Sequence, residues 1–132
     1  MVERVWVDTR GRGLHEITAM VAAKVKIVEG LCTLFVRHTS ASLVVQENAD
    51  PSAKADLERW LDRLVPDGDP FYRHDTEGPD DMPGHIKAAL TATSLSIPVL
   101  EGRLALGTWQ GIYLWEHRLR GSRREVVLHI GP

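Results

Sequence analysis

The sequence contains a single cysteine, Cys32, and so cannot form an internal disulfide; a reducing compartment is the natural expectation. No apolar run approaches the roughly 20 residues of a membrane-spanning helix, and no secretory signal opens the chain. The formal net charge of −2 gives no electrostatic reason to expect nucleic acid or an anionic membrane as partner. We therefore expect a cytoplasmic protein with no nucleic-acid or membrane partner.

Two widespread catalytic motifs are also missing. There is no G-x-S-x-G nucleophile elbow and no Walker-type glycine loop, which excludes the usual serine-hydrolase and P-loop functions. No internal repeat or low-complexity segment is present. With 132 residues, of which 43% are hydrophobic and 26% charged, the chain is typical of one globular domain covering residues 1–132.

Apolar periodicity and turn residues predict a mixture of strands and helices. We expect strands at 2–9, 31–37, 43–45, 94–100, 103–107, 109–117 and 124–130, and helices at 15–30, from Asp50-Pro51 onward, and near 83–92. Gly30 is a natural stop for the first helix, and Asp50-Pro51 is a strong start for the second. Because strands and helices do not alternate regularly, the pattern favours an α+β fold with mixed sheets packed with two or three helices.

Three of the six histidines lie where side chains converge on clefts. His38 follows a predicted strand, His74 lies in the long Pro- and Gly-rich segment 66–84, and His85 lies at a helix start. Imidazole is the commonest zinc ligand, and three protein ligands leave a position open for water. Without a tight pair such as H-x₃-H, however, spacing alone favours three separate histidines over one shared site.

The acids of the same segment have two possible uses. Glu77, Asp80 and Asp81 can hold a hard cation such as Mg²⁺ beside a phosphate, or Asp81 can cap the following helix while the others stay solvated. The two uses compete for the same carboxylate oxygens of Asp81. The start of this helix, near His85, also presents free N–H groups to an anion.

Polar residues stand at both ends of the short apolar run Leu43–Val45. Glu47 can act as a general acid or base if partly buried, and Asn48 can close a turn. Thr39 and Ser40 can donate to a phosphate or satisfy the backbone at the strand end. Further candidates are the amide of Gln110 in "GTWQG" and one or two guanidiniums of the cluster Arg118, Arg120, Arg123 and Arg124.

Three long segments resemble one known family. "HTSASLVVQENADPS", "RHDTEGPDDMPGHIKAAL" and "SIPVLEGRLALGTWQGIYLWEHR" closely resemble the YjbQ-like family, and the likeness runs from about residue 4 to 130. Members of this family are often labelled secondary thiamine-phosphate synthase. The resemblance implies a compact YjbQ-like α+β fold that assembles as a homotrimer.

The resemblance also implies a site. The motif histidines of the family match His38, His74 and His85, which favours one shared site, near a subunit boundary, over three separate histidines. Its acid-amide pair matches Glu47 and Asn48. We therefore expect Glu47, His74 and Asn48 to be catalytic and the three histidines to bind a divalent metal, Zn or Mg. Phosphate or substrate binding is expected from Thr39, Ser40, Gln110 and Arg120.

The family label implies the coupling of hydroxymethylpyrimidine diphosphate with a thiazole phosphate, which releases diphosphate. A cation or several hydrogen-bond donors stabilise such a leaving group. The first expectation is therefore a metal-assisted enzyme acting on a small phosphorylated metabolite. One alternative is a non-catalytic trimeric protein that binds a metal or small ligand. The other is a protein whose histidines bind an ion that only stabilises the contact between subunits.

Overall fold

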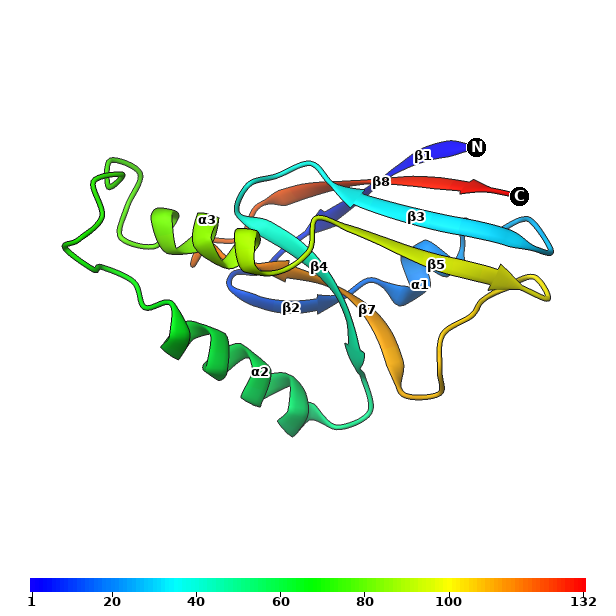
Figure 1. Ribbon diagram of the computed structural model, residues 1–132, viewed down its shortest axis with the longest axis horizontal. Helices are drawn as coiled ribbons and strands as arrows, with labels where there is room; N and C mark the ends of the chain where they lie inside the picture. Colours follow the sequence, from blue (N-terminus) through cyan, green and yellow to red (C-terminus); the bar gives the residue numbers. More distant parts are fainter.

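The computed structural model describes all of residues 1–132, which form eight strands and three helices. The elements are, in chain order, β1 Val2–Asp8, β2 Gly13–Glu16, α1 Thr18–Ala22, β3 Gly30–Val36, β4 Ala41–Glu47, α2 Pro51–Leu64, α3 Asp81–Leu90, β5 Ser94–Leu100, β6 Arg103–Leu104, β7 Gln110–Glu116 and β8 Arg123–Gly131. Both chain termini lie at one end of the molecule, and the loop between α2 and α3 extends from the other end (Figure 1). No helix is long and apolar enough to cross a membrane.

The strands form two curled antiparallel sheets. The five-stranded sheet has the order β1-β8-β3-β5-β6, and the three-stranded sheet has the order β2-β7-β4. Every strand pair is antiparallel, so the expectation of mixed sheets is wrong. After β4 the chain passes through α2 and α3 into the other sheet, where β5 pairs antiparallel with β3, so these helices do not make a parallel crossover.

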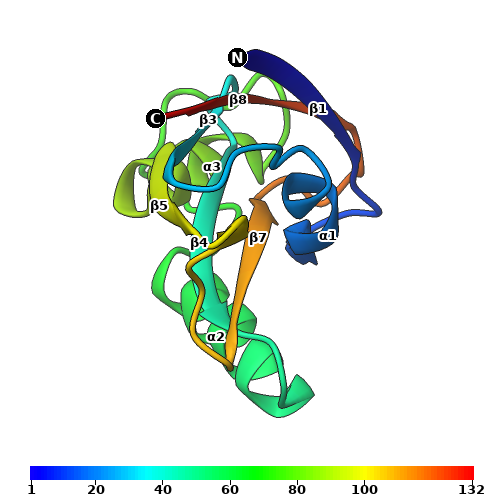
Figure 2. The ribbon, with the colours of Figure 1, turned by 90° about the vertical axis from the view of Figure 1, so that its right-hand side faces the viewer.

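The main core lies between the two sheets. Alternate residues of each strand face inward, as in β8, where Val126, Leu128 and Ile130 are buried. Ile17 and Val21 close this core from the side of α1. Figure 2 shows the resulting layers, with β1 and β8 at the top, β4 and β7 in the middle and α2 at the bottom.

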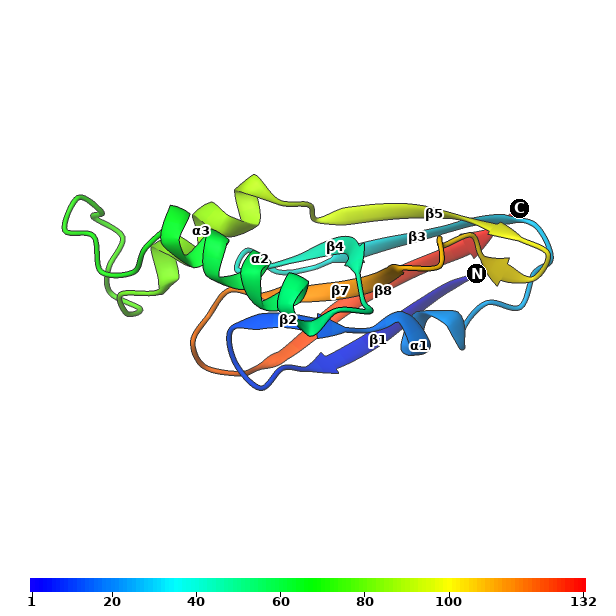
Figure 3. The same ribbon diagram turned by 90° about the horizontal axis from the view of Figure 1, so that it is seen from below.

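The helices pack on the three-stranded sheet and leave the outer face of the five-stranded sheet bare. α2 packs on β2 and α3 on β4, and α1 lies against β7. A second small core of Leu14, Leu61, Tyr113 and Trp115 fills the space beneath α2. The far ends of α2 and α3 and their connecting loop therefore project past β4 and β7 (Figure 3).

The predicted helix 15–30 is mostly wrong. Residues 13–16 form β2, α1 spans only five residues, and no helix follows it before β3. Pairing with β7 takes precedence over helical spacing, because the Ile17 N–H donates to the Ile112 carbonyl at 2.8 Å. Gly30 does not end a helix but begins β3 with a φ of 153°, where a Cβ would lie 2.2 Å from the Gly131 carbonyl oxygen.

The predicted start of α2 is confirmed. Asp50 is its N-cap, and its Oδ1 accepts a hydrogen bond from the Ser52 N–H at 2.9 Å. Pro51 occupies the first turn, where its missing N–H costs nothing. All seven predicted strands are found in the structure, where β6 has only two residues. They are β1, β3, β4, β5, β6, β7 and β8.

Candidate functional site

One group of three histidine and aspartate side chains lies close enough together to hold a metal ion. It consists of His74, Asp81 and His85. One ligand atom from each lies within 4.8 Å of the other two. Oδ2 of Asp81 lies 2.8 Å from Nε2 of His74 and 3.2 Å from Nε2 of His85. Ligands about 2.0–2.1 Å from a tetrahedral ion are roughly 3.3 Å apart, so the 3.2 Å separation is that of two ligands of one ion, whereas the 2.8 Å separation is a hydrogen-bond length.

Helical spacing and one loop bring the three residues together. Asp81 and His85 are four residues apart on α3 and so face the same side of the helix. His74 comes from the loop that precedes α3. The Asp81 side chain is 3% exposed, whereas those of His74 and His85 are 49% and 29% exposed, so the group has a buried carboxylate and an open side.

The hydrogen bond of His85 Nδ1 determines whether Nε2 of the neutral ring carries a proton or a lone pair. Nδ1 lies 3.0 Å from the Thr39 carbonyl oxygen, which only accepts, so Nδ1 carries a proton. In the neutral ring, Nε2 then holds a lone pair that faces Asp81 Oδ2. Two lone pairs at 3.2 Å repel, so the contact requires either a second proton on His85 or a cation between the two atoms.

Arg118 fixes the orientation of the Asp81 carboxylate. Its Nη1 donates to Asp81 Oδ1 at 2.8 Å, its Nε to Asp80 Oδ2 at 2.9 Å, and its Nη2 to the Glu77 carbonyl at 2.8 Å. Oδ1 of Asp81 is thereby occupied, and Oδ2 is left for the histidines. Burial raises the pKa of Asp81, but the His74 hydrogen bond and the His85 and Arg118 charges outweigh it and hold the pKa below its usual value.

Asp81 does not cap α3. The N-cap residue is Asp80, and its side chain makes no capping hydrogen bond, because Arg118 and the Leu119 N–H bind its Oδ2. Asp81 lies in the first helical turn instead. Of the two uses that the sequence left open for this carboxylate, capping is therefore excluded.

His38 lies outside this group. Its Nε2 accepts a hydrogen bond from the Glu125 N–H at 2.8 Å, and burial together with the Arg124 charge lowers its pKa. The structure thus brings together two of the three predicted histidines and places Asp81 beside them. The sequence indicated Asp81 as a possible ligand of a hard cation, and its helical spacing to His85 is the signal that pairs it with a histidine.

Glu47 and Asn48 lie at the opposite end of β4 from the histidines. Thr39 and Ser40 precede β4, and Glu47 ends it, seven residues or roughly 20 Å along the strand. Within one chain, the predicted acid-amide pair and the histidine group cannot contact the same small molecule. Tyr113 donates its hydroxyl to the Glu47 carbonyl at 3.3 Å, while the Asn48 amide donates to Glu16 at 3.1 Å.

The predicted phosphate-binding residues have different surroundings. Thr39 contributes its carbonyl to His85, and the buried Ser40 hydroxyl accepts from Arg124 at 3.0 Å. Gln110 uses its side-chain oxygen to accept from the Gly107 N–H at 2.7 Å and so closes its own turn. Arg120 is exposed, and its guanidinium makes no hydrogen bond or ion pair within the chain.

A buried polar network behind the site was not predicted. His117 is fully buried, with Nε2 2.9 Å from the Ser42 hydroxyl and Nδ1 unpartnered. The buried Lys87 ammonium pairs with Asp62, and Glu116 pairs with Arg124. The Ser42–His117 and Asp62–Lys87 contacts join residues 75 and 25 positions apart, so no local pattern could have indicated them, whereas Glu116 and Arg124 are eight residues apart across the turn between β7 and β8.

Comparison with known proteins assigns the family. The family model described as "UPF0047 protein YjbQ-like" matches residues 3–132. This chain belongs to the YjbQ/UPF0047 family. The expected resemblance is thereby confirmed over nearly the whole sequence.

Relatives within the YjbQ/UPF0047 family are similar in sequence and in fold. The chain is 54% identical over 127 residues to UPF0047 protein sll1880 of Synechocystis, covering 94% of this chain and 86% of the relative. It is 46% identical to UPF0047 protein YjbQ of Salmonella typhimurium, covering 93% and 91%. Among solved structures, the conserved hypothetical protein TT1486 of Thermus thermophilus has a TM-score of 0.88 at 38% identity, covering 98% and 99%. None of these names states an activity.

Proposed function

We propose that this protein is a metal-assisted enzyme that acts on a small phosphorylated metabolite, with a divalent ion bound by His74, Asp81 and His85. The contact that carries the proposal is the approach of His85 Nε2 to Asp81 Oδ2 at 3.2 Å, with the proton held on Nδ1 by Thr39. A second proton on His85 would satisfy this contact alone, whereas a cation between these atoms would make ligands of both and of His74 beside them. The carbonyl behind His85 is the kind of partner that orients metal-bound imidazoles.

The donor set favours zinc or a related transition metal over magnesium. Two imidazoles and one carboxylate suit Zn²⁺, whereas Mg²⁺ prefers oxygen ligands only. Three protein ligands and the exposed side of His74 leave a position for a substrate oxygen. When bound, such an ion polarises a phosphate oxygen and stabilises a departing diphosphate.

The coupling of hydroxymethylpyrimidine diphosphate with a thiazole phosphate to thiamine phosphate is the reaction we assign to this site. In this displacement the thiazole nitrogen forms the new bond to the pyrimidine methylene carbon as the bond to diphosphate breaks. The chain must then bind anionic oxygens beside the histidine group. Arg73, next to His74 in sequence, and Arg120, two residues after Arg118, are exposed and are the guanidiniums we propose for that purpose.

We further propose that the protein is a homotrimer in which the site lies near a subunit boundary. The bare outer face of the five-stranded sheet supports assembly, because it exposes Trp6, Leu31 and Phe35 at 41%, 41% and 49%. A neighbouring subunit is also the way to bring Glu47 and Asn48 to the histidine group, since β4 separates them within one chain. In that arrangement Glu47 acts as the general acid or base.

The test is product formation by metal-loaded protein. We expect Zn²⁺-loaded wild type to convert the two substrates to thiamine phosphate and diphosphate, measured by chromatography, and His85→Ala to lose this activity. Asp56→Ala, which removes an exposed carboxylate of α2 far from the bare sheet face, is the control and should retain it. Absence of product, or equal turnover by His85→Ala, contradicts the proposed enzyme. A ligand-induced rise in melting temperature without product favours the non-catalytic binding protein.

A further inference from the structure

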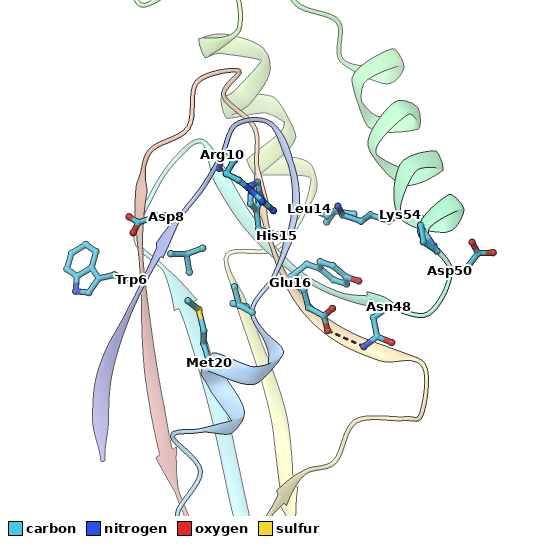
Figure 4. Close-up of a pocket in the computed structure, with 14 residues that line it drawn as sticks. Trp6, Asp8, Arg10, Leu14, His15, Glu16, Met20, Asn48, Asp50 and Lys54 are labelled. Carbon is cyan, nitrogen blue, oxygen red and sulfur yellow. Dashed lines mark hydrogen bonds between the residues drawn. The ribbon is translucent and has the colours of Figure 1, made fainter.

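A cleft of about 670 Å³ lies away from the histidine group. Its walls come from β1, β2, α1, β7 and the start of α2, and none of its lining residues belongs to the group of His74, Asp81 and His85. Figure 4 shows Trp6 and Asp8 on one side, Asp50 and Lys54 on the other, and Glu16 and Asn48 between them. This volume falls within the range of pockets that hold metabolite-sized ligands.

The floor of the cleft is apolar. Leu14, Ile17 and Tyr113 are at least 95% buried, and they line it together with Val7. Met20 on α1 reaches the rim and is 44% exposed. A ligand seated here would place an apolar or aromatic body on this floor and remove its own apolar surface from water.

One carboxylate at the cleft is held in place. Glu16 Oε2 accepts hydrogen bonds from Asn48 Nδ2 at 3.1 Å and from the Thr18 hydroxyl at 2.9 Å, whereas Oε1 has no partner within the chain. The two side chains meet over Gly111, where a Cβ would lie 2.7 Å from Glu16 Oε2 and 3.0 Å from Asn48 Nδ2. A glycine is therefore required for this pair, and it leaves Glu16 as an oriented acceptor.

The other charged groups of the cleft are less suited to selective binding of a ligand. Asp50 uses Oδ1 to cap α2. Arg10 and Lys54 have no hydrogen-bond partner for their charged ends, so nothing in the chain fixes their positions, whereas two hydrogen bonds hold the exposed Glu16. Burial, and after it the negative charges of Glu16 and Glu47, raise the pKa of Tyr113.

We infer that this cleft is a second ligand site, which takes a small molecule with an amine, amidine or amino-substituted heteroaromatic group on an apolar or aromatic body. The donor group of the ligand binds Glu16 Oε1 and its body lies on Leu14, Ile17 and Tyr113. A negative ligand of the same shape is disfavoured by the fixed Glu16 carboxylate. The site uses none of the proposed metal ligands His74, Asp81 and His85.

Benzamidine is the probe that tests this site, with benzoate as its anionic counterpart. Each is titrated into the full-length ¹⁵N-labelled protein in its native assembly, and backbone amide shifts are followed by NMR. We expect saturable benzamidine shifts at residues 14–17 and 48–50, and benzoate binding at least tenfold weaker. His74→Ala should bind benzamidine as wild type does, which separates this site from the proposed metal centre.

Glu16→Gln is the decisive variant, because it keeps the shape of the side chain and removes its charge. We expect at least tenfold weaker benzamidine binding, with an otherwise unchanged amide spectrum that shows the fold is intact. Glu101→Gln, at an exposed turn, is the control and should bind as wild type does. The inference is overturned if benzamidine does not bind, if benzoate binds equally, or if Glu16→Gln binds as tightly as wild type.

Discussion

At the residue scale, the geometry of the proposed metal site depends on Arg118. In Arg118→Ala the nearly buried Asp81 and Asp80 carboxylates lose their cation, and we expect unfolding to become easier by about 2–3 kcal/mol. Saturating Zn²⁺ should restore part of this loss, because an ion at Oδ2 compensates the same charge. Urea unfolding with and without Zn²⁺ measures both effects.

Arg120→Ala is the matched control for that variant. Its guanidinium is exposed and makes no hydrogen bond or ion pair within the chain, so the free energy of unfolding should change by less than about 0.5 kcal/mol. If Arg118→Ala is as stable as this control, the interaction of Arg118 with the two aspartates does not hold the site together.

The buried His117 predicts a particular pH dependence. Burial, followed by the Lys87 charge, lowers its pKa to about 3, whereas the unfolded chain takes up the proton near pH 6.5. Between these values the unfolded state binds more protons, so stability falls as pH falls, by at most about 1.4 kcal/mol per pH unit. Above pH 6.5 His117 no longer contributes to the pH dependence of the free energy of unfolding.

His117→Gln keeps an amide for the Ser42 hydroxyl but removes the titration. Denaturant unfolding between pH 4.5 and 6.5 should therefore give a shallower slope for this variant than for wild type. Glu116 does not obscure the comparison. Burial raises its pKa, but the Arg124 and Thr9 hydrogen bonds outweigh this and lower it, so its contribution is lost only at more acidic pH. Equal slopes for the two proteins would mean that His117 is protonated in the folded chain.

At the scale of elements, a short sequence pattern predicts a helix or strand correctly when interactions between neighbouring residues determine that element. The start of α2 is an example, because Asp50 and Pro51 act within one helical turn. The segment 15–30 shows the opposite case. Its apolar residues fit a helix, yet only Thr18–Ala22 is helical, because pairing with β7 places its start in β2 and the close approach of Gly30 to Gly131 places its end in β3. Partners so distant in sequence leave no trace in a short window.

The cap of α2 gives the prediction at this scale. Asp50→Ala removes the acceptor for the Ser52 N–H and should lower the free energy of unfolding by about 1 kcal/mol. Asp56→Ala, which removes an exposed carboxylate from the middle of the same helix, should cost less than about 0.5 kcal/mol. Thermal and urea unfolding of the two variants measure the difference, and equal losses would contradict the assignment of the cap.

At the scale of the whole molecule, the site could be predicted in part. His74 and His85 were candidates from their positions beside a helix start, and the structure brings them together. Asp81 was weighed both as a cap and as a ligand, and Arg118, thirty-seven residues away in sequence, decides against capping. His38 and Glu47 are held elsewhere by long-range pairings that composition and spacing do not record.

The bare sheet face gives the prediction for assembly. Phe35 lies on the outer face of the five-stranded sheet and is 49% exposed, as is Trp60 on α2 on the other side of the molecule. Phe35→Glu places a charge on the proposed interface and should convert the trimer to monomers in light scattering after gel filtration. Trp60→Glu is the control and should remain trimeric. A monomeric wild type, or a trimeric Phe35→Glu, contradicts assembly through this face.

The measurement that tests the central claim most directly is calorimetric titration of Zn²⁺ into untagged, metal-stripped protein. The account predicts one site per chain, at least tenfold weaker binding in Asp81→Asn and His85→Ala, and unchanged binding in His129→Ala. Because His38 Nε2 is occupied by the Glu125 N–H, His38→Ala should also bind as wild type does. No Zn²⁺ binding by the wild type, or equal binding by all variants, would contradict the metal centre at His74, Asp81 and His85.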